Sequence, residues 1–419
     1  MLAVVHSSRN YQKLLLQGSF FTAAVQLTSA YTVLPYICAE LSGPPIIVGL
    51  LVPAFTAGVL GGTMLAPRVL ASLRPIGQVL AGIALLQAVM TATMATAIAV
   101  VPEVAAFAVL CGSACVGILT GSFLVVLPMA LSALLSPQRR SDLLLRQVGY
   151  GAVLVIVITA YSSGFLSDES PGLDDATLLW IGAVGMAVAA AVGLTLGSGR
   201  RVVTAKPLRI REVLREGQQH IRRQGWLQRY VATQWVFTSV TLGPMFYGIY
   251  AAESLGPDNG DLDIILIFAG FGLLAGIPIW TCVRKFFGVR GMYICGASIS
   301  AIAAALCISS QMFRVLPALW TFGLAMLLAL VANQAIYPAS QEWILRRTPA
   351  NLRVVILSYS QIVFNVGLLV PAFALGLIAG QGPAIWPLAL MLSLNVTAIV
   401  AAAQVPRAKR RTQRVPTDR

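Results

Sequence analysis

The chain has 419 residues, of which 58% are hydrophobic and only 11% are charged, and its mean hydropathy is +0.82. A soluble domain carries about 25% charged residues, so this composition excludes a soluble globular protein and predicts a polytopic membrane protein. The net charge of +14 does not indicate a nucleic-acid partner, because membrane proteins collect Lys and Arg in the loops on one side of the bilayer.

Long apolar runs divide the chain into two similar halves. A helix needs roughly 20 mostly apolar residues to cross a bilayer. Such runs lie at 14–38, 46–66, 77–100, 103–135, 145–166 and 176–197, and then at 228–252, 262–282, 290–309, 315–341, 354–380 and 383–405. The sequence therefore predicts an all-α protein with 12 spans. Its expected parts are an N-terminal bundle (1–198), a central loop (199–227), a C-terminal bundle (228–405) and a basic tail (406–419).

The distribution of charge predicts the orientation in the membrane. If both termini are cytoplasmic, every one of the 29 Lys and Arg residues except Arg314 lies in a cytoplasmic segment, and most of the 15 acids lie in outer loops. This arrangement follows the positive-inside rule, which an inverted topology would violate. The first dozen residues are too weakly apolar for a cleaved signal peptide, so we expect the first span to remain as an anchor.

The central loop contains an amphipathic segment, LRIREVLREGQQHIRRQGWLQRY. Its apolar residues fall near one helical face, against many arginines, and they are Leu208, Ile210, Val213, Leu214 and Ile221. We expect a helix that lies on the inner surface of the membrane. Both a plain linker helix and a helix that binds a partner protein are compatible with this pattern.

Residues that would carry enzyme or metal chemistry are sparse. The six cysteines lie in or beside apolar runs without the spacing of metal ligands, which is typical of small buried hydrophobic residues. The two histidines, His6 and His220, both lie outside the predicted spans. The sequence contains no zinc-binding His-Glu pattern, phosphate-binding loop or nucleophile elbow. We therefore expect neither enzyme activity nor a metal or other cofactor.

The residues at 32–62, TVLPYICAELSGPPIIVGLLVPAFTAGVLGG, resemble the first two helices of the major facilitator superfamily. The similarity lies in a Leu-Pro near the outer end of the first helix, a short loop, a Val-Gly-Leu-Leu start and a Gly-rich second helix. Helix count, topology and loop placement extend the resemblance to the whole chain. The resemblance implies two six-helix bundles that rock around a midplane cavity, as in a secondary transporter that works by alternating access.

The loop after the second span departs from the family pattern. It reads GGTMLAPRVLASLRPIG, and Ala66 and Pro67 stand where the family usually has an aspartate. In the family this loop ties the halves together on the inside. We expect a cytoplasmic gate formed by Arg68, Arg74, Arg284, Arg290, Arg346 and Glu342. Its main ion pair would join Glu342 to Arg284, and the alternative is a solvated surface pair worth well under about 1 kcal/mol.

The resemblance also implies where a substrate would bind, because the family lines its cavity mainly with spans one, four, seven and ten. The candidate cavity residues on these spans and on span eleven are Thr22, Gln26, Gln234, Trp235, Asn333, Tyr337 and Asn365. Each has an alternative structural role. Ser, Thr, Asn and Gln often join helices by hydrogen bonds, and Tyr and Trp near span ends often lie at the membrane interface.

Charged groups are missing from the middle third of every predicted span. Charged substrates and proton relays usually need such groups, so we expect a small neutral or amphiphilic organic substrate. Export is favoured over import by analogy with the family, and a transport-inactive receptor or scaffold is the alternative function. If protons drive transport, the carboxylate must be peripheral, and Glu40 and Glu342 are the candidates. The small loops and the Ala- and Arg-rich composition indicate a bacterial inner membrane.

Overall fold

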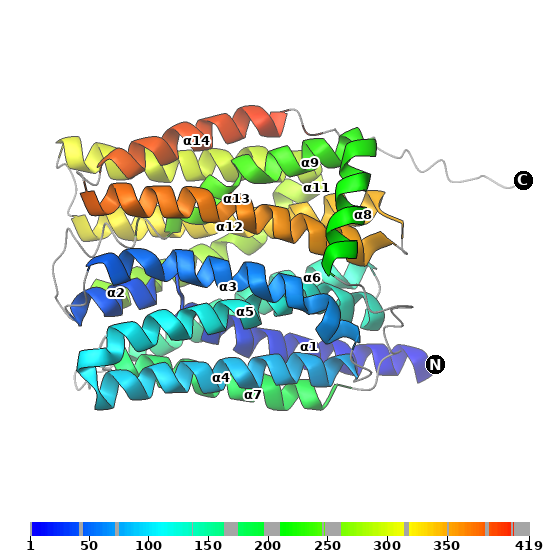
Figure 1. Cartoon of the computed structure of the whole chain (residues 1–419), viewed down its shortest axis with the longest axis horizontal. Coiled ribbons are helices and arrows are strands. Elements are labelled where there is room, and N and C mark those ends of the chain that lie inside the picture. Colours follow the sequence, from blue (N-terminus) through cyan, green and yellow to red (C-terminus); the bar gives the residue numbers. More distant parts are fainter. Residues whose placement is uncertain are drawn as a thin grey trace, which may run out of the picture.

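The computed structural model describes residues 2–41, 45–71, 75–135, 137–162, 175–196, 210–244, 247, 261–313, 318–349, 352–381, 385–403 and 405. These residues are almost entirely helical, and no strand occurs among them. Most of the helices run side by side along one direction, while α8 crosses their ends (Figure 1). The expectation of an all-α protein is therefore confirmed.

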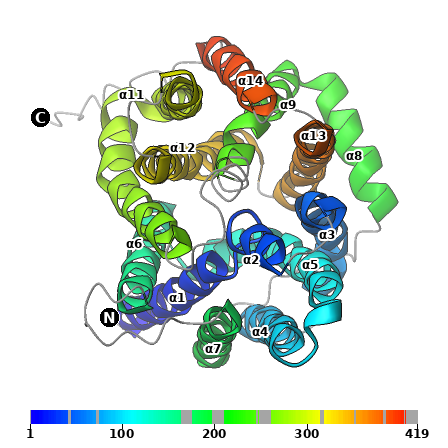
Figure 2. The same cartoon turned by 90° about the vertical axis from the view of Figure 1, so that its left-hand side faces the viewer.

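The helices form two groups that correspond to the two halves of the sequence. The first half contains α1 (Leu2–Leu27), α2 (Val33–Glu40), α3 (Pro45–Ala71), α4 (Ile76–Val100), α5 (Pro102–Leu134), α6 (Pro137–Ser162) and α7 (Asp175–Leu194). The second half follows α8 (Ile210–Arg223) and contains α9 (Gly225–Val236), α11 (Asp261–Phe313), α12 (Ala318–Arg347), α13 (Arg353–Gln381) and α14 (Ile385–Ala403). Figure 2 shows the two groups end-on, with α8 beside α13 and α3.

Nine helices within the described ranges are long and apolar enough to cross a membrane. One of them covers Ile264–Ser310 within α11 and is bent at Gly288, whose φ of 65° and ψ of −162° are not helical. A positive φ suits glycine, which has no Cβ. The bend lies between the predicted spans 262–282 and 290–309. The protein is therefore a multi-pass membrane protein, and the count of 12 spans stays a prediction because α1 and α9 are not among the nine.

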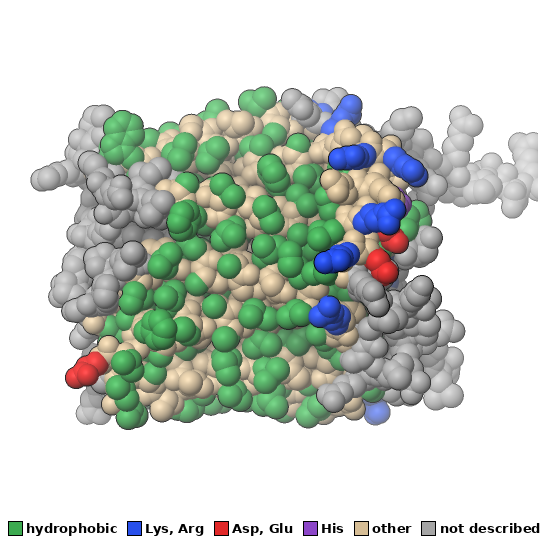
Figure 3. Space-filling model, in the orientation of Figure 1, with side chains coloured by type: hydrophobic (Ala, Val, Ile, Leu, Met, Phe, Trp, Pro, Cys, Tyr) green, Lys and Arg blue, Asp and Glu red, His purple; other side chains and the backbone are tan. Residues whose placement is uncertain are grey.

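Basic side chains gather at one end of the face shown in Figure 3. Apolar side chains cover the middle of the surface, and Lys and Arg gather at the end where α8 lies (Figure 3). The exposed arginines of α8 are Arg211, Arg215, Arg222 and Arg223. We call this the basic end, and α1 begins on the same side (Figure 1). The charge distribution agrees with the positive-inside expectation, in which the basic end is cytoplasmic.

The helix α8 has two faces, as the amphipathic pattern predicted. Val213 is 1% exposed, and Gly217 is buried against the ring of Tyr359 on α13. The helix also contacts α3 of the first half and α9 of the second. α8 therefore spans the boundary between the halves at the basic end.

The first half is held together by an unusually close approach of α3 and α5. Gly58 and Gly62 on α3 meet Gly117 and Gly121 on α5, and each pair is spaced four residues apart. A Cβ at Gly62 would overlap the backbone oxygen of Ile118, and one at Gly121 would overlap that of Val59. Small residues at this spacing let membrane helices pack backbone to backbone.

The two halves meet along two helix pairs, α3 with α13 and α6 with α11. Between α3 and α13, Asn365 Nδ2 donates a hydrogen bond to Thr63 Oγ1 at 3.3 Å. Between α6 and α11, Gly270 lies against Ile156 and Gly149 against Ile277. These contacts enclose the space in which the candidate site lies.

Candidate functional site

A cavity of about 200 Å³ lies between the two halves. Its wall includes α1, α3, α5 and α7 of the first half, and α11, α12 and residues 238–244 of the second half. The polar residues of the wall are Gln26, Thr28, Ser29, Thr32, Thr120, Thr241 and Asn333, together with Tyr31. The cavity is therefore shared by both halves, as a substrate site for alternating access requires.

None of the described residues in the wall of this cavity is an Asp, Glu, Lys, Arg or His. Gln26 and Asn333 bring one amide from each half, and neither side chain makes a hydrogen bond to another described residue. Each amide carries both donors and an acceptor. Tyr31 and Phe55 add an aromatic wall, with their rings edge to face and 5.4 Å apart. This chemistry suits an uncharged molecule with hydroxyl, carbonyl or amide groups.

A break in the first span forms part of the wall. The sequence predicted one helix over 14–38, but α1 ends at Leu27 and α2 begins only at Val33. Pro35 explains the break, because proline lacks an N–H and clashes with the carbonyl four residues earlier. The Ser29 carbonyl accepts hydrogen bonds from the N–H groups of Val33 and Leu34, both at 3.0 Å. Irregular backbone at membrane depth is tolerated where it is buried in protein or lines a cavity.

Of the seven predicted cavity residues, Gln26 and Asn333 line this cavity and the other five lie elsewhere. Gln234 is 4% exposed and donates from Nε2 to the hydroxyl of Tyr293 at 2.6 Å, inside the second half. Trp235 is half exposed and donates from Nε1 to the carbonyl of Val363 at 2.9 Å. These two residues join helices, which is the structural alternative that the sequence left open.

The remaining three predicted residues have different neighbours. Thr22 packs against Gly151 of α6, and Asn365 bonds to Thr63 as described above. Tyr337 lines a second, smaller cavity nearer the basic end. Tyr31 was not among the predicted cavity residues. The Leu-Pro at Leu34 and Pro35 was the available signal for the irregular backbone next to Tyr31.

The predicted ion pair of the gate is present. Arg284 Nε lies 3.2 Å from Glu342 Oε2, and the Glu342 side chain is only 18% exposed. Both residues belong to the second half, since Arg284 is on α11 and Glu342 on α12. The pair therefore does not itself bridge the halves. Its role as a gate stays a prediction.

The other residues predicted for the gate and for proton coupling are placed as follows. Arg68 is exposed in the last turn of α3, and Arg290 is half-buried on α11. Arg74 lies outside the described residues, as do the side chains of Arg346 on α12 and Glu40 at the end of α2. The roles of these residues in a gate or in proton coupling stay predictions.

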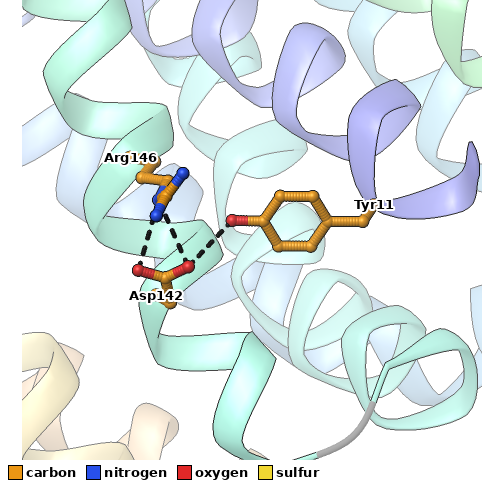
Figure 4. Close-up of polar contacts among 3 residues, drawn as sticks. All are labelled: Tyr11, Asp142 and Arg146. Carbon is orange, nitrogen blue, oxygen red and sulfur yellow. Dashed lines mark hydrogen bonds and ion pairs between the residues drawn. The ribbon is translucent and has the colours of Figure 1, made fainter. Parts of the chain in front are cut away.

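A second ion pair lies at the basic end of the first half (Figure 4). Asp142 accepts a hydrogen bond from the Tyr11 hydroxyl at 3.0 Å and pairs with Arg146 Nε at 3.2 Å. Burial raises the pKa of Tyr11, and the hydrogen bond to Asp142 raises it further, so the phenol stays a donor. The Tyr11–Asp142 hydrogen bond ties α1 to α6, whereas the Asp142–Arg146 pair lies within α6. Both charged side chains of the pair are more than half exposed, so it should add little stability.

Comparison with known proteins places these features in a family. No family model matches the chain. An uncharacterized protein of Mycobacterium tuberculosis is 34% identical over 413 residues, covering 96% of this chain and 78% of the relative. An uncharacterized protein of Mycobacterium bovis matches with the same identity and coverage.

Solved structures share the fold over nearly the whole chain. An inward open structure of the xylose transporter XylE from E. coli has a TM-score of 0.67 at 16% identity, covering 97% of this chain and 98% of that chain. The nucleoside transporter NupG has a TM-score of 0.60 at 13% identity, covering 93% and 98%. Both of these similar structures are of transporters. The chain belongs to the family of these mycobacterial proteins, and its fold is that of the major facilitator superfamily.

Proposed function

We propose that this chain is a secondary transporter that moves a small neutral or amphiphilic organic molecule by alternating access. The observation that carries the proposal is the cavity of about 200 Å³ between the halves, with an amide from each half and no charged side chain among its described lining residues. A charged substrate would leave its charge unpaired there, at a cost of several kcal/mol. An uncharged polar molecule would instead pair with Gln26 and Asn333.

The size of the cavity narrows the substrate class. Sites for drug-sized ligands usually enclose about 300–1,000 Å³. The volume of about 200 Å³ suits a smaller molecule in this state of the protein. The similar solved structures are of a xylose transporter and a nucleoside transporter, and the substrates in these names are neutral polar molecules of this general kind.

Transport by reconstituted protein is the direct test. A panel of neutral, anionic and cationic organic compounds is first screened for compounds that raise the melting temperature, since a ligand of the folded state stabilises it. Hits are then tested for exchange across liposome membranes. We expect stabilising hits to be neutral or amphiphilic and to show substrate-stimulated exchange. Binding without exchange would favour the receptor or scaffold alternative, and hits confined to charged compounds would contradict the assigned substrate class.

The direction of transport and its coupling to protons are further parts of the proposal. We favour export from the cytoplasm of a bacterial cell through its inner membrane, by analogy with the family. Because the described part of the cavity wall has no carboxylate, we place proton binding at Glu40 or Glu342. Transport driven by a pH gradient across the same liposomes tests these two proton sites. If both Glu40→Gln and Glu342→Gln keep transport driven by the gradient, the two sites are excluded.

The Arg284–Glu342 pair is expected to influence which side of the cavity is open. Glu342→Gln removes the charge that holds Arg284, which frees the basic end of α12. We expect the population to shift toward the inward-facing state. A cysteine introduced at Thr241 in the cavity should then react more slowly with an impermeant maleimide added outside. Asp142→Asn, which breaks the exposed pair of the first half, is the matched control, and an unchanged rate in Glu342→Gln would contradict the gate.

A further inference from the structure

A second cavity, of about 60 Å³, lies between the halves near the basic end. The first half contributes residues of α5 and α6 to its wall, and the second half contributes residues of α12 and α13. Two arginines, Arg140 and Arg353, line it, and none of its described lining residues is acidic. The two cavities have no described lining residue in common. The smaller cavity is therefore a separate feature, and its described wall is positively charged where that of the larger cavity is uncharged.

The two arginines occupy equivalent positions in the two halves. Arg140 Nε donates to the carbonyl of Leu135 at 3.0 Å, and Arg353 Nε donates to that of Thr348 at 3.4 Å. In each case the acceptor is five residues earlier, at the end of the preceding helix. Leu144 and Leu357, each four residues after its arginine, also line the cavity. These backbone bonds anchor both guanidinium groups at the same small space.

The two guanidinium groups make this space positively charged. Burial lowers the pKa of Arg140, and the positive charge of Arg353 lowers it further. Like charges in a partly desolvated site repel, because little water screens them. Gln341 also lines the cavity, is only 8% exposed, and its Oε1 has no hydrogen-bond partner among the described residues.

We propose that this cavity binds a small oxyanion that carries a hydroxyl, with the phosphate group as the type, between Arg140 and Arg353. Guanidinium groups pair with phosphate oxygens through strong charge-assisted hydrogen bonds. The hydroxyl of a hydrogen phosphate can donate to Gln341 Oε1, which a sulfate cannot do. The bound anion bridges the two halves and holds their basic ends together.

The volume limits what can enter. About 60 Å³ corresponds to roughly two water molecules in the liquid, which admits a single phosphate group but not an organic body beside it. The phosphate group could come from inorganic phosphate or from the headgroup of phosphatidic acid. Both sources present a monoester-like phosphate with a hydroxyl near neutral pH.

Thermal unfolding of the full chain in nanodiscs tests the proposal. Discs of phosphatidylcholine in a chloride buffer receive sodium phosphate, sodium sulfate or more chloride at matched ionic strength. A second set of discs contains phosphatidic acid and no free phosphate. We expect phosphate, or phosphatidic acid, to raise the melting temperature in a saturable way and more than sulfate does. Arg140→Gln and Arg353→Gln should each weaken the apparent affinity roughly tenfold or more.

Controls separate the site from general effects on stability. Arg139→Gln removes an exposed arginine next to the cavity and should keep the full response. Because the Gln variants also lose a backbone hydrogen bond, Gln341→Leu provides a variant that keeps both charges. It should remove the preference for phosphate over sulfate. A response to phosphatidic acid alone identifies the headgroup as the source.

Two results would overturn the proposal. The first is an equal response in wild type, Arg140→Gln and Arg353→Gln. The second is the absence of any response to either phosphate source in the wild type. The transport assay does not enter either outcome, so the site stands or falls independently of the proposed function.

Discussion

Replacing Gly62 with alanine is expected to destabilise the first half severely, whereas the same change at the neighbouring Gly61 should be tolerated. A methyl group at Gly62 would overlap the backbone oxygen of Ile118, which cannot move aside as a side chain can. At Gly61 the nearest atom is Ile118 Cγ1 at 4.0 Å, an ordinary contact. Overpacking typically costs about 1–3 kcal/mol and more when backbones must separate. Gly61→Ala should instead gain up to about 1 kcal/mol from helix propensity.

The comparison is made in detergent by gel-filtration profile and melting temperature. We expect Gly62→Ala to give little monodisperse protein or a clearly lower melting temperature, and Gly61→Ala to match or exceed the wild type. Gly121→Ala, whose methyl group would meet the backbone oxygen of Val59, should reproduce the defect from the opposite helix. Equal behaviour of Gly61→Ala and Gly62→Ala would show that α3 and α5 are not packed backbone to backbone.

Asn333→Leu is expected to weaken substrate binding with little loss of stability, and Gln334→Leu is expected to do the reverse. Asn333 lines the central cavity and makes no hydrogen bond to another described residue. Its replacement should cost about one hydrogen bond to the substrate, or roughly a tenfold rise in the dissociation constant. Gln334 lies outside the cavity wall and donates from Nε2 to the carbonyl of Leu273 at 2.8 Å.

Both variants replace a side-chain amide with leucine. Asn333 and Gln334 are neighbours on α12, but their side chains face different surroundings. The dissociation constant is measured with a compound from the thermal-shift panel, and stability is measured without it. Gln26→Leu should behave like Asn333→Leu, because Gln26 supplies the amide of the other half. Equal loss of affinity in Asn333→Leu and Gln334→Leu would mean that the cavity described here is not the substrate site.

The local pattern of the sequence was sufficient for the class of protein and for much of its outline. Hydropathy is summed along a segment, so long apolar runs predicted helices such as α4 (Ile76–Val100) without knowledge of their neighbours. Charge is also a local property, and the arginines of 200–229 indicated a basic end that the structure shows on α8. Gln26 and Asn333, chosen as polar residues near mid-span, lie in one cavity.

The pairing of helix faces was decided only in three dimensions. Gln234 and Gln26 looked alike as polar residues within spans, yet Gln234 faces Tyr293 and Gln26 faces the cavity. The rotation of each helix depends on packing against its neighbours, for example where Gly62 meets Ile118. Hydropathy carries no information about that rotation.

Contacts between the halves depend most strongly on the tertiary structure. Arg284 and Glu342 were predicted to pair, and they do, but only the fold shows that both lie in the second half. Arg140 and Arg353 were counted in the sequence merely as cytoplasmic charge. The folded chain brings these two like charges into one small cavity, because two helix ends from different halves meet there. Composition and charge thus determine which segments can cross the membrane and which side is basic, whereas packing between helices decides which polar groups share a site.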